Sequence, residues 1–293
     1  MNGIDERKEL RKRLQKEQRR LLLRKFLTNK LAMGGAVITL TVVTLALLAG
    51  VICPEGPLEM SVFDRLTPPS LDGYLFGSDN LGRSVLARVL YGARLSLSIG
   101  AGVGLLSMIF GMVLGLYASY YPALDNVIMR ICDGLSAIPS TLLAIAMMAM
   151  LEPNIGNLII SLTVVSTPRV ARVARSSAVV VRQQTYIEAM RALGASSTRI
   201  IWGHIAPNIL SGVVVQSSYI FANAIITEAA LSFLGVGVPA PSPSWGNILF
   251  DGKAVIHKAW WMIIFPGIFT AMTVLGLNIF GDGLRDVLDP HTN

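Results

Sequence analysis

The sequence is poor in charged residues and rich in apolar ones. Only 15% of its 293 residues are charged and 53% are hydrophobic, with a mean hydropathy of +0.58. Soluble globular domains carry about 25% charged residues. The composition therefore excludes an ordinary soluble domain and predicts an integral membrane protein.

Cysteine and histidine are also scarce, and they are scattered. The cysteines are Cys53 and Cys132, and the histidines are His204, His257 and His291. They form no CxxC or Cys/His spacing, and the sequence contains no HExxH, GxSxG or GxxxxGK[ST] motif. We therefore expect no disulfide framework, no metal site, no catalytic residues and no nucleotide-binding loop in this chain.

The net charge of +7 comes from the N-terminal tail. Residues 1–30 contain eleven Lys/Arg and four Asp/Glu, so the rest of the chain contains fourteen of each. A nucleic-acid interface would spread its basic residues over a folded face, whereas these precede a hydrophobic run. No nucleic-acid partner is expected. The tail is either an anchor on anionic membrane lipid or, as we favour, the stop signal for the first span.

Long uncharged runs predict the membrane spans, because about 20 apolar residues are needed to cross the hydrocarbon core. Six runs approach this length: Leu31–Ile52, Leu95–Leu124, Gly134–Leu151, Pro153–Pro168, Ile205–Thr227 and Ala259–Gly281. The first is too long for a signal peptide and is expected to be retained. The prolines of Val236–Trp260 argue against a seventh span, and Pro168 is expected to interrupt the fourth helix. The resulting prediction is an all-α integral membrane protein with six transmembrane helices.

Basic residues predict the orientation of these spans. The stretch 169–199 contains six arginines and one acid, and the tail is also basic. Since Lys and Arg accumulate on the cytoplasmic side, both termini are expected inside and residues 54–90 and 237–258 outside. Asp133, near the inner end of the third run, is expected to pair with Arg130 or with the row Arg169, Arg172 and Arg175.

Four glycines in the second run predict tight helix packing. Gly100 and Gly104 form one GxxxG pattern and Gly111 and Gly115 form another. Such pairs let helix backbones approach closely, so we favour packing over a pore lining.

The segment Gln183–Asn208 predicts a short helix, a glycine turn and a second short helix. Thr185 and Glu188 have the spacing of a capping box, which would start the first helix at Tyr186. Gly194 would end it with a positive φ. Its apolar side would be formed by three residues at helical spacing, Ile187, Met190 and Leu193.

The second helix would start after Ser196 or Ser197 and end at Pro207. An amphipathic helical pair between spans can have either of two functions, and the sequence pattern does not distinguish between them. It can sit in a groove of a soluble partner, or it can lie on the lipid surface.

This segment resembles the EAA signature of permease subunits of binding-protein-dependent ABC importers. That signature reads Glu-Ala-Ala, three residues, Gly, nine residues, Ile, one residue, Leu-Pro. Here Glu188-Ala189, Gly194 and Pro207 match it, whereas three positions depart from it, Met190, His204 and Ala206. A histidine at the position of His204 is common in the dipeptide, oligopeptide and nickel branch of this family, which the segment therefore resembles.

Further resemblances to the second permease of that branch lie along the chain from about residue 70. They are Phe76–Asp79 with Gly82-Arg83, Tyr91–Arg94, Glu228-Ala229, Leu231–Gly235, Pro243–Gly246, Gly281–Asp286 and Leu288–Pro290.

The resemblance implies the type I ABC importer permease fold with cytoplasmic coupling helices. Its domains would be a basic cytoplasmic tail (1–30), the first span and an extracytoplasmic loop (31–91), a five-helix core (92–283) with the coupling loop 183–208, and a cytoplasmic C-terminus (284–293). The residues that couple to the ATPase would be Glu188, Ala189, Met190, Leu193, Gly194, His204 and Pro207.

The resemblance also implies partners and a location. The partners would be a sister permease, two cytoplasmic ATPase subunits that hold ATP and Mg, and an extracytoplasmic solute-binding protein. The cargo would be peptides or a related solute such as nickel chelates, moved across a bacterial or archaeal inner membrane. This chain would bind no cofactor and would not itself be an enzyme.

The fifth run contains three polar residues that are candidates for the substrate pathway: Gln216, Asn223 and Glu228. Glu228 lies twenty residues after Asn208, which puts it ~30 Å along a helix and therefore near the outer mouth. A carboxylate there can face a water-filled path, although we favour a structural hydrogen bond or ion pair to the following turn.

Two other classes of membrane protein are weaker alternatives. A secondary ion-coupled transporter would usually need internal repeats and several intramembrane ionisable residues. An intramembrane protease would need a Ser/His or paired Asp constellation at membrane depth. The sequence supports neither.

Overall fold

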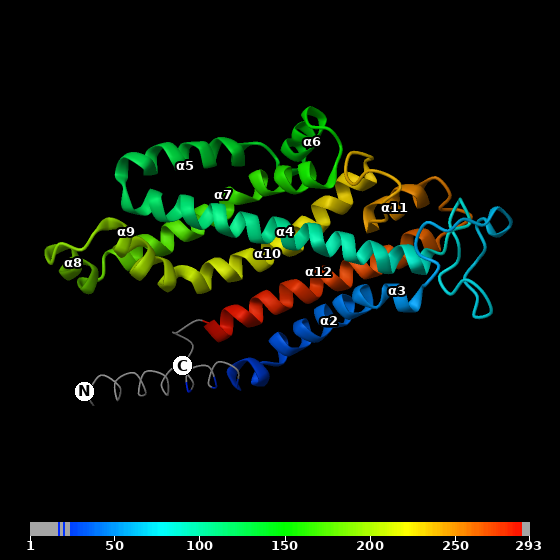
Figure 1. Ribbon diagram of the computed structural model, residues 1–293, viewed down its shortest axis with the longest axis horizontal. Helices are drawn as coiled ribbons and strands as arrows, with labels where there is room; N and C mark the ends of the chain where they lie inside the picture. The colour runs from blue at the N-terminus through cyan, green and yellow to red at the C-terminus, as the bar shows by residue number, and fades with distance from the viewer. Residues whose placement is uncertain (1–16, 18–19, 21–23, 289–293) are drawn as a thin grey trace.

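The computed structural model describes Glu17, Arg20 and residues 24–288. Most of the predicted basic tail and the last residues of the C-terminus, including His291, lie outside the described residues. Within them the chain is helical, and its long helices run side by side along one axis (Figure 1). The helices are α2 (Lys30–Leu47), α3 (Ala49–Ile52), η1 (Val62–Asp64), α4 (Val85–Tyr120), α5 (Pro122–Ala137), α6 (Ser140–Met150), α7 (Ile155–Arg182), α8 (Thr185–Ala192), α9 (Ser197–Ile200), η2 (Ile201–Ile205), α10 (Ala206–Phe233), α11 (Trp245–Lys253) and α12 (Trp261–Leu288).

The two ends of the bundle carry different connections. At one end lie α8 and α9, and at the other lie α11 and the long segment between α3 and α4 (Figure 1). We call these the α8 end and the α11 end. Helices α2 and α12 pack along one flank, while α4 packs against both α7 and α10.

Among the described residues, four helices are long and apolar enough to cross a membrane: α2, α4, α12 and the continuous helix Ser197–Phe233. The predicted third span is not straight, because α5 and α6 meet at an angle of 94° beside Pro139. Helix α7 is long enough to cross a membrane but is not apolar enough, because its second half contains several arginines. The structure therefore shows at least four apolar spans, or five if the bent pair counts as one.

Pro168 does not interrupt the fourth helix, contrary to the sequence prediction. It lies inside α7, which continues to Arg182. The hydroxyl of Thr167 donates to the carbonyl of Thr163 at 2.7 Å in the turn before it. Close packing of α7 against α4 compensates for the lost backbone hydrogen bond.

The arginines of α7 tie it to α5. Arg175 Nε and Nη2 each lie 2.5 Å from a carboxylate oxygen of Asp125. Arg172 Nη2 lies 3.2 Å from Asp133 Oδ1, so the predicted pairing of Asp133 with the arginine row is confirmed. Cys132 is the only α5 residue that is buried. These polar contacts therefore hold a helix that buries little apolar surface of its own.

The four glycines of α4 allow two different helices to approach it. A Cβ added at Gly100 would lie 2.6 Å from the Phe221 ring of α10, and one at Gly115 would lie 2.6 Å from the carbonyl oxygen of Ala171 on α7. The prediction of tight packing is confirmed. The two GxxxG pairs contact different neighbours, however, rather than one shared partner.

At the α11 end, buried ion pairs fix the segment between α3 and α4. Asp79 is fully buried, and its Oδ2 lies 2.6 Å from Arg83 Nε and 2.7 Å from Arg88 Nη1. Arg88 Nη1 also lies 2.9 Å from Asp251 Oδ2 of α11. The Trp261 ring of α12 donates to the carbonyl of Ser78 at 3.0 Å. The segment is thereby joined to α4, α11 and α12.

Candidate functional site

The candidate coupling loop forms the predicted helix, glycine turn and helix at the α8 end. Gly194 has φ +80°, which confirms the predicted positive φ. The amide of Gly194 donates to the carbonyl of Arg191, and the amide of Ala195 donates to the carbonyl of Met190, both at 3.0 Å. This is a Schellman motif, in which a residue without a Cβ penalty ends the helix. The direction of the chain into α9 therefore depends on Gly194.

The start of α8 differs from the prediction. Its N-cap is Gln184, which makes no side-chain capping bond, and Thr185 lies inside the helix. The predicted capping box between Thr185 and Glu188 is therefore wrong. The chain leaves α7 after Arg182 and turns at Gln183 and Gln184, whose amides donate to the carbonyls of Val180 and Val181, before α8 begins.

One residue anchors α8 to the bundle. Ile187 is fully buried in an apolar cluster that also holds Ile200, Ile201 and Ile205. Met190 is half-buried against the same cluster, whereas Leu193 is 86% exposed. The predicted apolar side is thus split between the bundle and the surface, since α8 turns away from the core toward its C-terminal end.

Three signature residues of this segment, Glu188, Ala189 and Gly194, are exposed. The carbonyl of Ala189 accepts the amide hydrogen of Leu193 at 3.0 Å at the end of α8. Beside them, the guanidinium of Arg191 lies 4.9 Å from the centroid of the Tyr120 ring, at the end of α4. The structure therefore presents part of the signature outward while it fixes α8 against the end of α4.

The second helix does not end at Pro207, contrary to the prediction. A π-helical turn, η2, joins α9 to α10, and Pro207 lies in the first turn of α10. A proline in the first turn of α10 costs little free energy, because the wider π turn before it already shifts the backbone N–H groups out of the α-helical hydrogen-bond pattern. His204 lies in η2, half-buried, and its carbonyl accepts a hydrogen bond from Asn208 Nδ2 at 2.6 Å. The loop is thus joined without interruption to the long helix Ser197–Phe233.

Glu228 lies at the other end of that helix in a buried polar cluster. Its side chain is fully buried and accepts hydrogen bonds from the hydroxyls of Ser96 at 3.0 Å and Ser232 at 2.8 Å. Ser244 is a third polar neighbour. The Ser232 hydroxyl also accepts from the amide of Val238 at 3.0 Å. Glu228 therefore joins α10 to α4 and to the turn before α11.

Gln216 and Asn223 lie elsewhere on α10, one above the other at a spacing of seven residues. Gln216 lines a cavity of about 360 Å³ between α7, α10 and α12, together with Ser177, Tyr219 and Arg285. The Tyr219 hydroxyl donates to Asp282 Oδ1 of α12 at 2.5 Å. Asn223 is half-buried. The structure does not bring these two side chains together with Glu228, which faces α4 instead.

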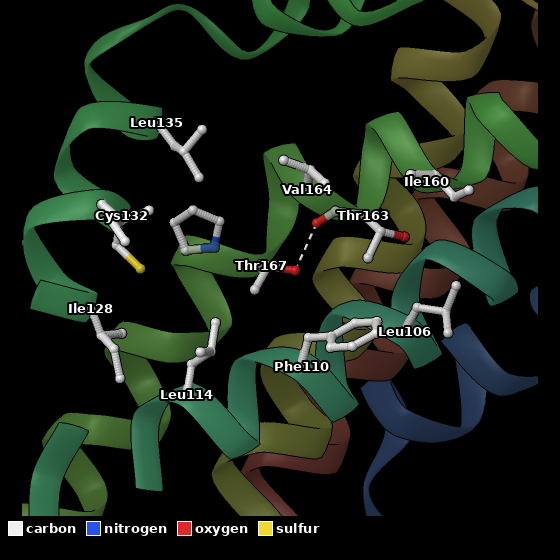
Figure 2. A pocket seen from close by; sticks show the side chains of 12 residues that line it. Leu106, Phe110, Leu114, Ile128, Cys132, Leu135, Ile160, Thr163, Val164 and Thr167 are labelled. Atoms are coloured by element: carbon white, nitrogen blue, oxygen red, sulfur yellow. Dashed lines mark hydrogen bonds between the residues drawn. The ribbon is translucent and has the colours of Figure 1, made fainter. Parts of the chain in front are cut away.

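A second cavity has a different chemistry. It measures about 450 Å³ and lies between α4, α5 and α7, where side chains such as Phe110, Leu135 and Ile160 face a common space (Figure 2). The hydroxyl of Thr167 turns back to its own helix, to the Thr163 carbonyl (Figure 2). An almost wholly apolar lining provides no partner for the charged ends of a peptide, so this cavity is a poor candidate for cargo binding.

Sequence reasoning missed the Asp79 ion-pair cluster as a structural unit. The motif that contains Asp79 and Arg83 is visible in the sequence, but Arg88 and Asp251 are 163 residues apart. Opposite charges at distant positions of the sequence are the only sequence signal for such a pairing, and they do not identify the partners.

Comparison with known proteins places the chain in a family. The profile described as "Binding-protein-dependent transport system inner membrane component" matches residues 107–293. A second profile, "N-terminal TM domain of oligopeptide transport permease C", matches residues 17–69.

Relatives match along most of the chain. A putative peptide transport system permease protein of Brucella abortus is 46% identical over 271 residues, which cover 92% of this chain and 91% of that protein. The dipeptide transport system permease protein DppC of Alkalihalophilus pseudofirmus is 42% identical, with 89% of this chain and 86% of the relative covered. The protein of the same name from Bacillus subtilis is 36% identical, with 91% and 84% covered.

A solved structure agrees at the level of the fold. It is described as an inward-facing conformation of the MetNI methionine ABC transporter, and it matches with a TM-score of 0.59 at 19% identity. The match covers 69% of this chain and 97% of that one. The chain therefore belongs to the family of binding-protein-dependent transport system inner membrane components, and it has the all-helical type I ABC importer permease fold.

Proposed function

We propose that this protein forms half of the translocation pathway of an ATP-driven importer of small peptides. The observation that carries the proposal is the match to peptide and dipeptide permeases over about nine-tenths of the chain. Peptides are favoured over nickel chelates because the three relatives above are named for peptide or dipeptide transport. As a membrane-spanning permease subunit, the chain supplies a path and not the hydrolysis of ATP.

The proposed topology has six spans. The bent pair α5 and α6 forms the third span, and the first half of α7 forms the fourth, ending where its arginines reach the inner lipid headgroups. The α8 end then faces the cytoplasm with both termini, and the α11 end faces outward. The arginine-rich stretch 169–199 supports this orientation. The domain boundaries 1–30, 31–91, 92–283 and 284–293 follow from it.

The proposed partner of the α8 end is an ATPase subunit, one of two that would hold ATP and Mg. The exposed positions Glu188, Ala189, Leu193 and Gly194 support this proposal, because they offer a surface that the bundle itself does not use. Met190, His204 and Pro207 would act indirectly, by holding α8 and η2 against the ends of α4 and α7. A sister permease would complete the pathway, and a solute-binding protein would deliver the cargo from outside.

Gln216 and Asn223 are the residues that we propose for the path. They share a face of α10, and the cavity beside Gln216 contains hydroxyl, amide and guanidinium groups that can pair with a peptide. Glu228 is proposed as a structural residue, since its side chain is fully buried and its carboxylate is occupied by serine hydroxyls.

Reconstitution tests the proposal. Proteoliposomes that contain this chain, its sister permease and the ATPase subunits should accumulate a radiolabelled dipeptide only when ATP and the solute-binding protein are both present. The isolated chain should hydrolyse no ATP. Uptake driven by a proton or sodium gradient without ATP would instead support the alternative, a secondary ion-coupled transporter.

A further inference from the structure

The segment between α3 and α4 is a rigid platform at the α11 end. Beyond the Asp79 ion pairs, Ser78 Oγ accepts the amide hydrogen of Thr67 at 2.8 Å and donates to the carbonyl of Asp64. A Cβ added at Gly82 would lie 1.7 Å from the carbonyl oxygen of Ser61, so this backbone approach is possible only for glycine. The platform, residues 54–84, therefore holds its surface side chains in fixed positions.

This rigid platform exposes large apolar side chains. Phe63, in η1, is 100% exposed, Leu71 is 90% exposed and Val62 is 68% exposed. Exposure of this kind is expected for a helix that faces lipid, but these residues lie in a connection beyond the ends of the spans (Figure 1). Large apolar side chains that are exposed outside the hydrocarbon core are typical of a protein interface.

The platform also contains a pocket with acidic walls. The pocket measures about 440 Å³ and is lined by Glu55, Glu59, Ser61 and Tyr74, among others. The Tyr74 hydroxyl lies 3.4 Å from Asp64 Oδ2. Glu55 and Glu59 give the pocket a negative charge. Consistent with this, burial and the nearby carboxylates of Asp64, Glu59 and Glu55 raise the pKa of Tyr74 above its ordinary value. A cationic side chain would fit this environment.

We propose that the platform docks the extracytoplasmic solute-binding protein. Phe63 and Leu71 would pack into an apolar surface of that protein, and a lysine or arginine beside this surface would enter the pocket between Glu55 and Glu59. The inference rests on the proposed function, which supplies a protein partner on this side of the membrane. It goes beyond that function in naming the surface and the chemistry of its complement.

Charge distinguishes this partner from a membrane surface. The exposed side chains of the platform include Glu55, Glu59 and Asp72, against one exposed arginine, Arg65. Anionic lipid headgroups would repel this arrangement. A second copy of this chain would present the same negative charge and would also be repelled. A partner with basic groups around an apolar surface satisfies both features.

The first experiment measures docking in the assembled transporter. The complete complex is placed in lipid nanodiscs, and its ATPase rate is titrated with the purified solute-binding protein whose gene neighbours that of the permease. Phe63→Ser and Leu71→Ser should each raise the half-saturating concentration on the order of tenfold, as loss of an interface anchor does. The maximal rate should be unchanged. The double variant Glu55→Gln, Glu59→Gln should raise the half-saturating concentration by a smaller factor. It should also make this concentration less dependent on salt.

The matched control is Leu40→Ala, because Leu40 is 65% exposed but lies within the apolar helix α2. It should leave the titration unchanged. If the wild-type complex is not stimulated by the binding protein, the proposed function fails. If the wild type is stimulated and the Phe63 and Leu71 variants titrate like it, the docking surface proposed here is wrong.

The second experiment separates protein from lipid. A nitroxide is attached to Phe63→Cys, while Cys53 and Cys132 are buried and should remain unlabelled. The label should collide with a water-soluble nickel chelate and lose that access when the binding protein is added. A label that instead collides mainly with lipid-dissolved oxygen would show that the platform lies on the membrane, which would overturn the proposal.

Discussion

At the α11 end the platform is held by buried ion pairs, whereas at the α8 end the candidate coupling loop is held by buried isoleucines. Asp79 receives two guanidinium groups and is fully buried. Ile187 is also fully buried, but no ion pair in the described part of the chain involves the exposed Glu188 beside it. Ion pairs fix distances and directions, while an apolar anchor allows the surface around it to change partners. The platform is therefore held by directional charged contacts, and the loop 183–208 by apolar packing.

Removing Asp79 should have the largest effect on stability. In Asp79→Ala the guanidinium groups of Arg83 and Arg88 stay buried and keep only Asp251, so we expect a loss of about 3–5 kcal/mol in the free energy of unfolding. Thermal unfolding of the detergent-solubilised protein measures it. Asp133→Ala is the control, because the Asp133 and Arg172 side chains are both exposed and such pairs contribute about 0–1 kcal/mol. Equal losses in both variants would contradict the comparison.

Removing the apolar anchor should have the second-largest effect on stability. Ile187→Ala leaves a cavity in the apolar cluster that also holds Ile200 and Ile201, and core truncations of this kind cost about 2–5 kcal/mol. Met190, the contact of Arg191 with the Tyr120 ring and the hydrogen bond from Asn208 to the Tyr186 hydroxyl still hold α8, so the damage should stay local. Hydrogen exchange should therefore rise in residues 183–196 and remain unchanged in residues 54–84. A rise at both ends would show that the two loops are not independent.

Local sequence signals predicted what depends on local chemistry. The uncharged runs located α4, α10 and α12, and the glycine after an amphipathic helix predicted the turn at Gly194. The bend beside Pro139 was missed because the third run was identified by its lack of charged residues, which does not register a proline inside it.

The continuity of the helix through Pro207 was also missed, since a π turn removes the conflict that a proline normally creates. The partners of Asp79 and Glu228 come from distant helices and could not be assigned from spacing.

Replacing the glycine of the turn should affect function more than overall stability. Gly194→Val places a β-branched side chain at φ +80°, which costs on the order of 1–2 kcal/mol. A Cβ would meet no neighbour there, so the strain comes from the backbone alone. We expect the spans to insert normally, while transport is abolished because α9 is misdirected. Dipeptide uptake and co-purification of the ATPase measure this outcome, and normal uptake would exclude coupling through this turn.

Glu188→Ala should have the smallest effect on stability and is the most specific test of the coupling loop. Because Thr185 does not cap α8, Glu188 takes no part in a capping box, and its side chain is exposed. Substitutions at such surface positions change the free energy of unfolding by about 0.5 kcal/mol or less.

Any loss of transport in a normally stable Glu188→Ala protein must then come from a missing contact with a partner. We expect weaker ATPase co-purification with an unchanged melting temperature. Thr185→Ala is the matched control, since Thr185 is also exposed on the same helix and should change neither quantity. If Glu188→Ala instead lowers the melting temperature as much as Ile187→Ala does, Glu188 stabilises α8 itself, and its proposed role at the partner surface is wrong.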